Sequence, residues 1–258
     1  MLSPAGAGQV LAPWPNRLDT GRYQFEGTHA SAAIDETARN TAIHGLVRWL
    51  SWQPLRVEAS VVSLTCTVGP QPGYPWRLRL ELDYDLEPTT LTVSVRASNG
   101  SLGRCPFGIG FHPYLAAIPH GLDDARLEVP ATEHLLLDER GLPVGVESPG
   151  GGLLVGELRD QALDDCYTGL RVDGDGYWRV RFQPSGPSGA EVVLFADARF
   201  GYVMCFTGDT LDPPRRRRGV AVEPMTCPPN ALRSGTDLVV LDPGATFSAS
   251  WGIGFSAR

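Results

Sequence analysis

Trp76-Arg-Leu-Arg-Leu-Glu-Leu-Asp-Tyr-Asp-Leu86 is the stretch of this sequence with the clearest two-residue period. Apolar or aromatic residues occupy every even-numbered position, and charged residues occupy every odd-numbered position. A β-strand places these two sets on opposite faces, whereas an α-helix would mix them. The pattern therefore predicts a strand that buries one face in a core and exposes the other.

The same alternation recurs in shorter runs along the chain. Such runs cover residues 61–68, 91–96, 178–182, 191–195, 202–206 and 247–255. Turn clusters rich in Gly, Pro and Asp separate them, and no long segment has helical periodicity. Many short strands in one long chain predict an all-β fold, a large antiparallel β-sandwich with few or no long helices. Without a linker-like segment or a fixed repeat, residues 1–258 are expected to form a single domain.

Composition excludes several classes of partner. The chain has 22 basic and 29 acidic residues, a net charge of -7, which argues against nucleic acid or an anionic membrane. No apolar run approaches the roughly 20 residues of a membrane span, and the first residues do not resemble a signal peptide. Five scattered cysteines suggest reduced thiols, so we expect a cytoplasmic protein.

One acidic residue follows a short apolar strand in Gly219-Val-Ala-Val-Glu223-Pro-Met-Thr226-Cys-Pro-Pro-Asn230-Ala. We expect the strand to end at Glu223, because the prolines that follow cannot donate to a sheet ladder. A carboxylate held there by a rigid turn can face a cavity, as a general base must. Taken alone, this stretch fits a surface glutamate at a strand end better.

Other chemically useful groups lie outside the alternating runs, among Gly, Pro and aromatic residues. They occur in residues 11–18, 42–49, 106–115 and 163–168. Loops on a rigid scaffold are where binding and catalytic sites usually form. These four segments are therefore expected to contribute side chains to one site.

Five motifs in these segments and around Glu223 occur in a recognisable order. They are Asn16-Arg17, His44-Gly45, His112-Pro113-Tyr114, Asp164 ahead of Tyr167, and Glu223-Pro-Met-Thr226 with Pro229-Asn230-Ala231. From about Gln9 to the C-terminus the chain resembles the aldose 1-epimerases, the galactose mutarotase-like proteins, in their bacterial branch. The resemblance implies a two-sheet β-sandwich of that kind. It also implies an isomerase that interconverts the α and β anomers of a free aldose, a small-molecule sugar.

The implied chemistry needs one base and one acid. Mutarotation opens a hemiacetal ring and closes it on the other face, so the anomeric hydroxyl loses a proton while the ring oxygen gains one. A carboxylate and a histidine suit this task near neutral pH, and neither a cofactor nor a metal is expected. The resemblance assigns Glu223 as the base and His112 as the acid, which we expect on opposite sides of the sugar.

The resemblance also implies which residues bind the sugar. Its hydroxyl groups would be held by His44, Arg17, Asn16 and Asp164. Tyr114 or Trp49 is a candidate to pack on the apolar face of the ring. Asp164 and Asp165 are adjacent, so only one of them can face the site from an extended backbone; the family motif favours Asp164.

Several patterns have a competing interpretation. Arg215-Arg-Arg-Arg218 is typical of a solvated loop, and its functional alternative is a subsite for a phosphate or sulfonate on the sugar. A zinc site has no support in the spacing of Cys and His, and Gly108-Ile-Gly110 lacks the third glycine of a dinucleotide fingerprint.

Two other functions remain open. A glycoside hydrolase would use Glu223 and Asp164 as its carboxylate pair, and a non-catalytic carbohydrate-binding domain would only hold the sugar. His112, in the most distinctive loop, favours the mutarotase over both. The family ordinarily carries further strands before the Asn-Arg motif, which here lies within the first twenty residues. We therefore expect this chain to lack the family's first strands, and Met1–Gly8 to be a loop.

Overall fold

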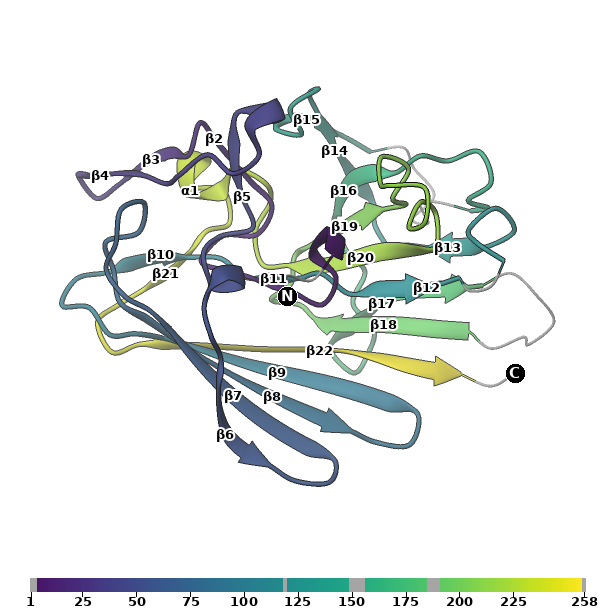
Figure 1. Cartoon of the computed structure of the whole chain (residues 1–258), viewed down its shortest axis with the longest axis horizontal. Helices are drawn as coiled ribbons and strands as arrows, with labels where there is room; N and C mark the ends of the chain where they lie inside the picture. The colour runs from purple at the N-terminus through teal and green to yellow at the C-terminus, as the bar shows by residue number, and fades with distance from the viewer. Residues whose placement is uncertain (1–3, 118–119, 149–155, 185–190, 257–258) are drawn as a thin grey trace.

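The computed structural model describes residues 4–117, 120–148, 156–184 and 191–256. Two large antiparallel sheets of eight strands each dominate it (Figure 1). We name them the β20 sheet and the β22 sheet after a central strand of each. The large antiparallel β-sandwich predicted from the sequence is therefore confirmed.

The β20 sheet has the order β1-β11-β20-β19-β16-β14-β15, and β12 also pairs with β20. Its strands are β1 (Val10–Leu11), β11 (Gly110–Phe111), β12 (Tyr114–Ala116), β14 (Glu133–Leu137), β15 (Pro143–Glu147), β16 (Asp164–Thr168), β19 (Tyr202–Phe206) and β20 (Gly219–Met225).

The β22 sheet has the order β13-β17-β18-β22-β9-β8-β7-β6. Its strands are β6 (Gln53–Val57), β7 (Val61–Val68), β8 (Leu78–Leu86), β9 (Thr90–Asn99), β13 (Arg126–Glu128), β17 (Tyr177–Gln183), β18 (Glu191–Asp197) and β22 (Thr246–Ser256).

Three two-stranded sheets and a few short helical turns complete the described residues. The pairs are β2 (Arg17–Asp19) with β5 (Thr41–Ile43), β3 (Arg22–Phe25) with β4 (Thr28–Ser31), and β10 (Cys105–Phe107) with β21 (Val239–Leu241). The helical turns are η1 (Pro4–Gly6), η2 (Thr37–Arg39), η3 (Val47–Trp49) and α1 (Ala231–Ser234). None of these is long and apolar enough to cross a bilayer.

The two-residue periods predicted the strands correctly. All seven alternating runs fall on strands of the two large sheets: β7, β8, β9, β17, β18, β19 and β22. In β8 the leucines at 78, 80 and 82 are at most 1% exposed, because they face the other sheet. Glu81, on the opposite face of β8, pairs with Arg96 of β9 at 2.6 Å.

Most of the apolar core lies between the two large sheets. A smaller cluster lies on the other face of the β20 sheet and consists of Leu135, Cys166, Tyr202, Met204 and Met225. Met204 is the cross-strand partner of both Cys166 and Glu223, so all three side chains share this face. The face of the β20 sheet that points away from the main core therefore carries Glu223.

The expected end of the strand at Glu223 is wrong, because β20 continues through Pro224 to Met225. The N–H groups of Val222 and Thr226 donate to the carbonyls of Pro113 and Ile109, at 3.2 and 2.9 Å. Alternate residues of a strand present their N–H groups to the same side, so the nitrogen of Pro224 faces the break between β11 and β12. No ladder hydrogen bond is lost there. Glu223 pairs with Met204 of β19 on one side and faces the break between β11 and β12 on the other.

Candidate active site

His112 and Glu223 are in direct contact. His112 lies in the break between β11 and β12, and its Nε2 is 3.3 Å from Oε1 of Glu223 on β20. The two residues are only 5% and 3% exposed. We expected them on opposite sides of a sugar, and the structure instead places them side by side. The ring oxygen and the anomeric oxygen are bonded to the same carbon, so adjacent groups can reach both.

Burial decides the protonation of this pair. Burial, and then the negative charge of Asp164, raises the pKa of Glu223 to about 8 against the opposing effect of Arg17. Burial, with a smaller contribution from Arg48, lowers the pKa of His112 to about 4. Both shifts disfavour the charged form, as expected for groups removed from water. Near neutral pH the pair therefore holds one proton and no net charge.

Two buried atoms of the pair have no hydrogen-bond partner among the described residues: Oε2 of Glu223 and Nδ1 of His112. Buried polar atoms are nearly always satisfied, so each such atom calls for an explanation. A ligand that brings hydroxyl groups would provide the missing partners. The pair thus has both the proton and the free positions that acid-base chemistry requires.

His44 reaches the same place from a strained turn. Its backbone has a φ of 63°, and its ring packs edge-on against His112 with 5.4 Å between centroids. The N–H of Asn16 donates to Nδ1 of His44 at 3.3 Å, and the N–H of His44 donates to the carbonyl of Asn16 at 2.9 Å. Gly45 must lack a side chain, since a Cβ there would lie 2.2 Å from the carbonyl oxygen of Ala12.

The hydrogen bond from the N–H of Asn16 to Nδ1 fixes the tautomer of the His44 ring. Burial, followed by the positive charges of His112, Arg48 and Arg17, holds the pKa of His44 well below its usual range, so the ring is neutral. Because Nδ1 accepts a hydrogen bond, the proton of a neutral ring sits on Nε2. His44 is thus prepared to donate a hydrogen bond from Nε2. The Oδ1 of Asn16 accepts from the N–H of Arg17 at 2.8 Å, so Asn16 shapes this turn with both its backbone and its side chain.

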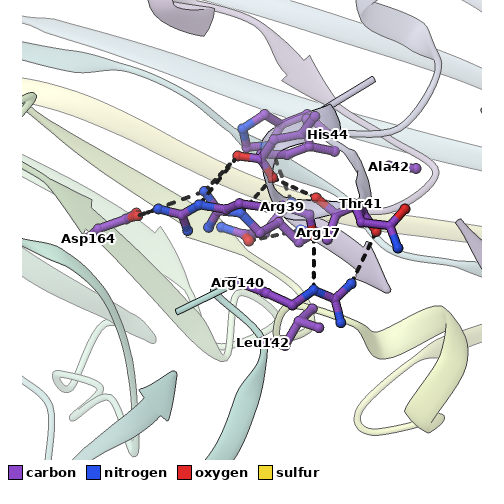
Figure 2. A network of polar contacts seen from close by, with 12 residues as sticks. Arg17, Arg39, Thr41, Ala42, His44, Arg140, Leu142 and Asp164 are labelled. Atoms are coloured by element: carbon purple, nitrogen blue, oxygen red, sulfur yellow. Dashed lines mark hydrogen bonds and ion pairs between the residues drawn. The ribbon is translucent and has the colours of Figure 1, made fainter. Parts of the chain in front are cut away.

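The other polar half of the site is a network of charged groups (Figure 2). Arg17, 7% exposed, binds Glu36 with two hydrogen bonds, from Nε at 2.8 Å and from Nη2 at 3.1 Å. Its Nη2 also lies 3.8 Å from Oδ2 of Asp164, and that oxygen accepts a hydrogen bond from Arg39 at 3.2 Å. Nη1 of Arg17 is buried and has no partner among the described residues.

Sequence reasoning missed three members of this network: Glu36, Arg39 and Arg140. Arg140, in the tip between β14 and β15, donates to the carbonyl of Arg39 at 2.9 Å and to Asp19 at 2.6 Å. It thereby fixes the segment that carries Glu36 and Arg39 against the β20 sheet. No local pattern marks these residues, because the contacts that bring them to the site, with Arg17, Asp164 and the carbonyl of Arg39, join positions 19 to 125 apart in the sequence.

The choice of Asp164 over its neighbour agrees with the strand geometry. Asp164 faces Arg17 and Arg39, whereas Asp165 points to the opposite side of β16 and contacts Nε2 of His134 at 2.9 Å. Nδ1 of His134 contacts Glu147, also at 2.9 Å. His134 is therefore a paired, partly buried residue.

The two aromatic candidates have other contacts. Tyr114 stacks on the ring of His112, with 5.2 Å between centroids and 19° between the ring planes. The side chain of Trp49 is 53% exposed and lies under the guanidinium of Arg48, 4.6 Å from its centre. The structure thus brings Tyr114 to the site through His112 and leaves Trp49 at the surface.

The arginine run does not act as a unit. Arg217 donates to the carbonyls of Leu158 and Gln161 at 2.6 and 2.9 Å, and it also pairs with Asp209. Arg215 and Arg218 are exposed and line a cavity of about 430 Å³ that Tyr114 borders. Arg217 therefore holds neighbouring loops together through their carbonyl groups, whereas Arg215 and Arg218 line the cavity.

His44, His112 and Glu223 also form a group whose ligand atoms all lie within 4.8 Å of one another. Two histidines and a carboxylate are a common metal-binding set. A ligating histidine, however, normally donates its second ring N–H to an acceptor. Nδ1 of His44 instead faces a backbone N–H donor, so the hydrogen bonding fits proton chemistry better than metal binding.

Solved structures show the class of fold to which this chain belongs. The chain is similar to solved galactose mutarotase-like folds. A GalM/aldose epimerase homologue from Caenorhabditis elegans superposes with a TM-score of 0.85 at 17% identity, covering 99% of this chain and 84% of that one. A galactose mutarotase-like protein from Clostridium acetobutylicum gives 0.82 at 17% identity, covering 96% and 79%.

The sequence comparisons define the family. The aldose 1-epimerase family model matches residues 2–253, and the chain belongs to that family. The uncharacterized protein YihR of Escherichia coli is 32% identical over 242 residues, 93% of this chain and 76% of YihR. Human galactose mutarotase is 26% identical over 152 residues, which cover 56% of this chain and 43% of that protein.

Proposed function

We propose that this protein is an aldose 1-epimerase that interconverts the α and β anomers of a free aldose. The observation that carries the proposal is the contact between His112 and Glu223, 3.3 Å apart and opposite in the direction of their pKa shifts. Family membership supports the reaction class. The reaction needs a proton donor and a proton acceptor, and this pair provides both with the protein's own residues.

The pair holds one proton, so two arrangements are available. In one, the Glu223 carboxylate takes the proton of the anomeric hydroxyl while the His112 imidazolium protonates the ring oxygen. That step breaks the bond between the anomeric carbon and the ring oxygen and leaves the open-chain aldehyde. It also leaves the second arrangement, a carboxylic acid beside a neutral imidazole. Ring closure on the other face of the aldehyde uses this arrangement and restores the first.

The remaining groups would hold the sugar. His44 would donate from Nε2 to an oxygen near the reacting carbon. Asp164 and Arg17, with Arg39 beside them, would bind hydroxyl groups further along the ring, because a carboxylate accepts and a guanidinium donates. Asn16 would act through His44, whose turn it fixes. Tyr114 would act through His112, on which it stacks.

The alternative functions have less support. A glycoside hydrolase would use Asp164 as its second carboxylate, but Asp164 is paired with Arg39 and lies close to Arg17, and the group beside Glu223 is a histidine. A domain that only binds sugar would not need a buried carboxyl with a raised pKa beside a buried histidine with a lowered one. Five buried free cysteines fit the expected cytoplasmic location.

Polarimetry on freshly dissolved α-glucose, α-galactose and other free aldoses tests the proposal. The wild-type protein should speed the approach to anomeric equilibrium, and Glu223→Gln should return the rate close to that of buffer. The ratio kcat/KM should follow a bell-shaped pH profile with limbs near 4, where His112 of the free enzyme gains a proton, and near 8, where Glu223 loses one. Wild-type protein that matches buffer on every aldose would reject the proposal.

A further inference from the structure

The turn formed by residues 4–9 lies directly on His112. The N–H of Gly8 donates to the carbonyl of His112 at 2.8 Å, and the N–H of His112 donates to the carbonyl of Gln9 at 3.1 Å. Figure 1 shows this segment beside β11 and β20, at the centre of the molecule. The sequence predicted only a loop here, with no role in the site.

The backbone of this turn is held in an unusual conformation. Ala5 has a φ of 53° and Gly6 a φ of 74°, both in the left-handed region that residues other than glycine rarely adopt. Such conformations persist where the surroundings determine them, and they cluster at functional sites. Tyr114 donates from its hydroxyl to the carbonyl of Ala5 at 3.3 Å, so the turn is also tied to the residue that stacks on His112.

Gly6 approaches the reacting edge of the His112 ring. A Cβ at position 6 would lie 3.0 Å from Cδ2 and 3.2 Å from Nε2 of His112. Nε2 is the atom that contacts Glu223, so a methyl group there would press on the nitrogen that must exchange the proton. A Cβ at Gly8, which has the same φ of 74°, would meet nothing within 4 Å.

The other sides of the ring are already occupied. Tyr114 stacks on one face, His44 lies edge-on with 5.4 Å between centroids, and Glu223 contacts Nε2. The ring cannot move away from an added group without disturbing one of these contacts, because close-packed interiors transmit such strain. The Cδ2–Nε2 edge is open only because residue 6 has no side chain.

We propose that Gly6 is a positioning residue for His112. The turn at 4–9 fixes the ring, and the missing side chain at position 6 leaves Nε2 within reach of both Glu223 and the sugar's ring oxygen. The kinetic part of this inference rests on the proposed epimerase function. The placement of the ring does not, so the two can be tested separately.

The experiment compares Gly6→Ala with Gly8→Ala. Both substitutions place alanine at the same positive φ and keep the backbone N–H groups, so the strain that arises from a positive φ is matched between them. Only the alanine at position 6 meets the His112 ring. Gly6→Ala should have a kcat about 10- to 100-fold below that of Gly8→Ala, with KM changed much less, because small displacements of a catalytic group have effects of this size.

Nuclear magnetic resonance of the five histidine rings provides the readout that does not depend on activity. The His112 resonances, assigned by their loss in His112→Asn, should shift in Gly6→Ala and stay close to their wild-type positions in Gly8→Ala. Equal kcat values for the two variants together with unmoved His112 resonances would overturn the proposal. If the wild type shows no mutarotase activity, a shift confined to Gly6→Ala would still support the positioning role while the proposed function fails.

Discussion

The two polar halves of the site differ in whether their groups are charged and in how those groups are paired. At one end, His112 and Glu223 are deeply buried, carry no net charge near neutral pH, and leave polar atoms without partners. At the other end, Arg17, Glu36, Asp164 and Arg39 are charged and paired to one another. The first half is left unsatisfied, as a group that must move a proton requires. The second half is fixed in advance, as groups that orient a sugar require.

The contrast is clearest between two glutamates. Burial raises the pKa of Glu223. Burial has the same effect on Glu36, but hydrogen bonds from Arg17 and Thr41 outweigh it and the pKa of Glu36 is lowered. Near neutral pH the same type of side chain therefore keeps its proton at position 223 and is an anion at position 36. The substitutions below test that division.

Removing either member of the acid-base pair should have the largest effect. Glu223→Gln and His112→Asn keep a polar group of similar shape, so each should lower kcat about 10²–10⁴-fold, or roughly 3–5 kcal/mol of barrier. The affinity for the sugar should stay within about tenfold, because the charged half still binds the hydroxyls. Polarimetry measures both quantities after subtraction of the spontaneous rate in buffer.

The double variant sharpens this expectation. One proton leaves as the other arrives, so the loss in Glu223→Gln/His112→Asn should be far smaller than the product of the single losses. Arg39→Gln, in the charged half, is the matched control and should change KM more than kcat. If Glu223→Gln keeps near-normal turnover, Glu223 is not the base, and Asp164 becomes the next candidate.

The same substitution should stabilise the protein at alkaline pH. The pKa of Glu223 is about 8 in the folded state and about 4.5 in the unfolded state, so the folded protein holds the extra proton between these values. The contribution of Glu223 to the free energy of unfolding therefore falls as pH rises from 4.5 and levels off above 8. Glu223→Gln removes this penalty, so its stability relative to wild type should increase from pH 5 to pH 9, by on the order of 3 kcal/mol.

Chemical denaturation at several pH values measures this difference. The charged half provides the control, because Arg39→Gln leaves the penalty on Glu223 in place. A Glu223→Gln protein whose relative stability is the same at pH 5 and pH 9 would show that Glu223 is already ionised in the folded state. The claim that the half of the site with His112 and Glu223 carries no net charge near neutral pH would then be wrong.

Glu36→Gln, in contrast to Glu223→Gln, should lower the free energy of unfolding relative to wild type. It leaves Arg17 buried without its main anion, and breaking a buried pair in this way costs about 3–5 kcal/mol. Because the side chain of Glu36 is 23% exposed, we expect a smaller loss, about 2 kcal/mol at pH 7. The pKa of Glu36 is lowered in the folded state, so its contribution is present above the unfolded pKa and is lost as pH falls through the folded one.

The measurement is again denaturation as a function of pH. The difference between Glu36→Gln and wild type should shrink in acid, where the wild-type carboxyl also becomes neutral. Arg56 and Glu58 form an exposed pair at 2.6 Å, so Glu58→Gln is a suitable surface control and should have little effect. If Glu36→Gln and Glu58→Gln lower the free energy of unfolding equally, the charged half of the site is no more stabilising than an exposed surface ion pair.

The sequence allowed much of this arrangement to be predicted, and the reason differs from part to part. The strands carry a two-residue period because each large sheet buries one face, so β8 could be read from Trp76–Leu86 alone. His112, Glu223, His44, Arg17 and Asp164 were predicted as site residues from short motifs that resemble those of a family, and the structure brings them close to one another. Glu36 and Arg39 could not be found, because their role depends on contacts with Arg17 and Asp164 that only the folded chain creates.

Position within an element was harder to predict than the element itself. Proline is a good signal for the end of a strand in general, yet Pro224 lies inside β20 because its neighbouring strand is interrupted at that point. The direct contact between His112 and Glu223 was also unexpected, since no spacing in the sequence reports a distance across a sheet. The turn at residues 4–9 had no pattern beyond its glycines and alanines, and its contact with His112 is visible only in three dimensions.

The smallest effect is expected where neither half of the site is touched. In the arginine run, Arg217 binds carbonyl groups of neighbouring loops, whereas Arg215, Arg216 and Arg218 are exposed.

A triple variant that changes Arg215, Arg216 and Arg218 to Ser and keeps Arg217 should change turnover of neutral sugars less than about twofold, and stability by less than about 0.5 kcal/mol. Arg217→Ser alone should instead destabilise the protein by about 1–3 kcal/mol, because it removes the donor from partly buried carbonyls. Polarimetry on neutral aldoses and on the same sugars bearing a phosphate or sulfonate separates the interpretations. If the triple variant loses turnover only on the anionic sugars, the exposed arginines form an anion subsite beside Tyr114, and the charged end of the site extends beyond Arg17 and Arg39.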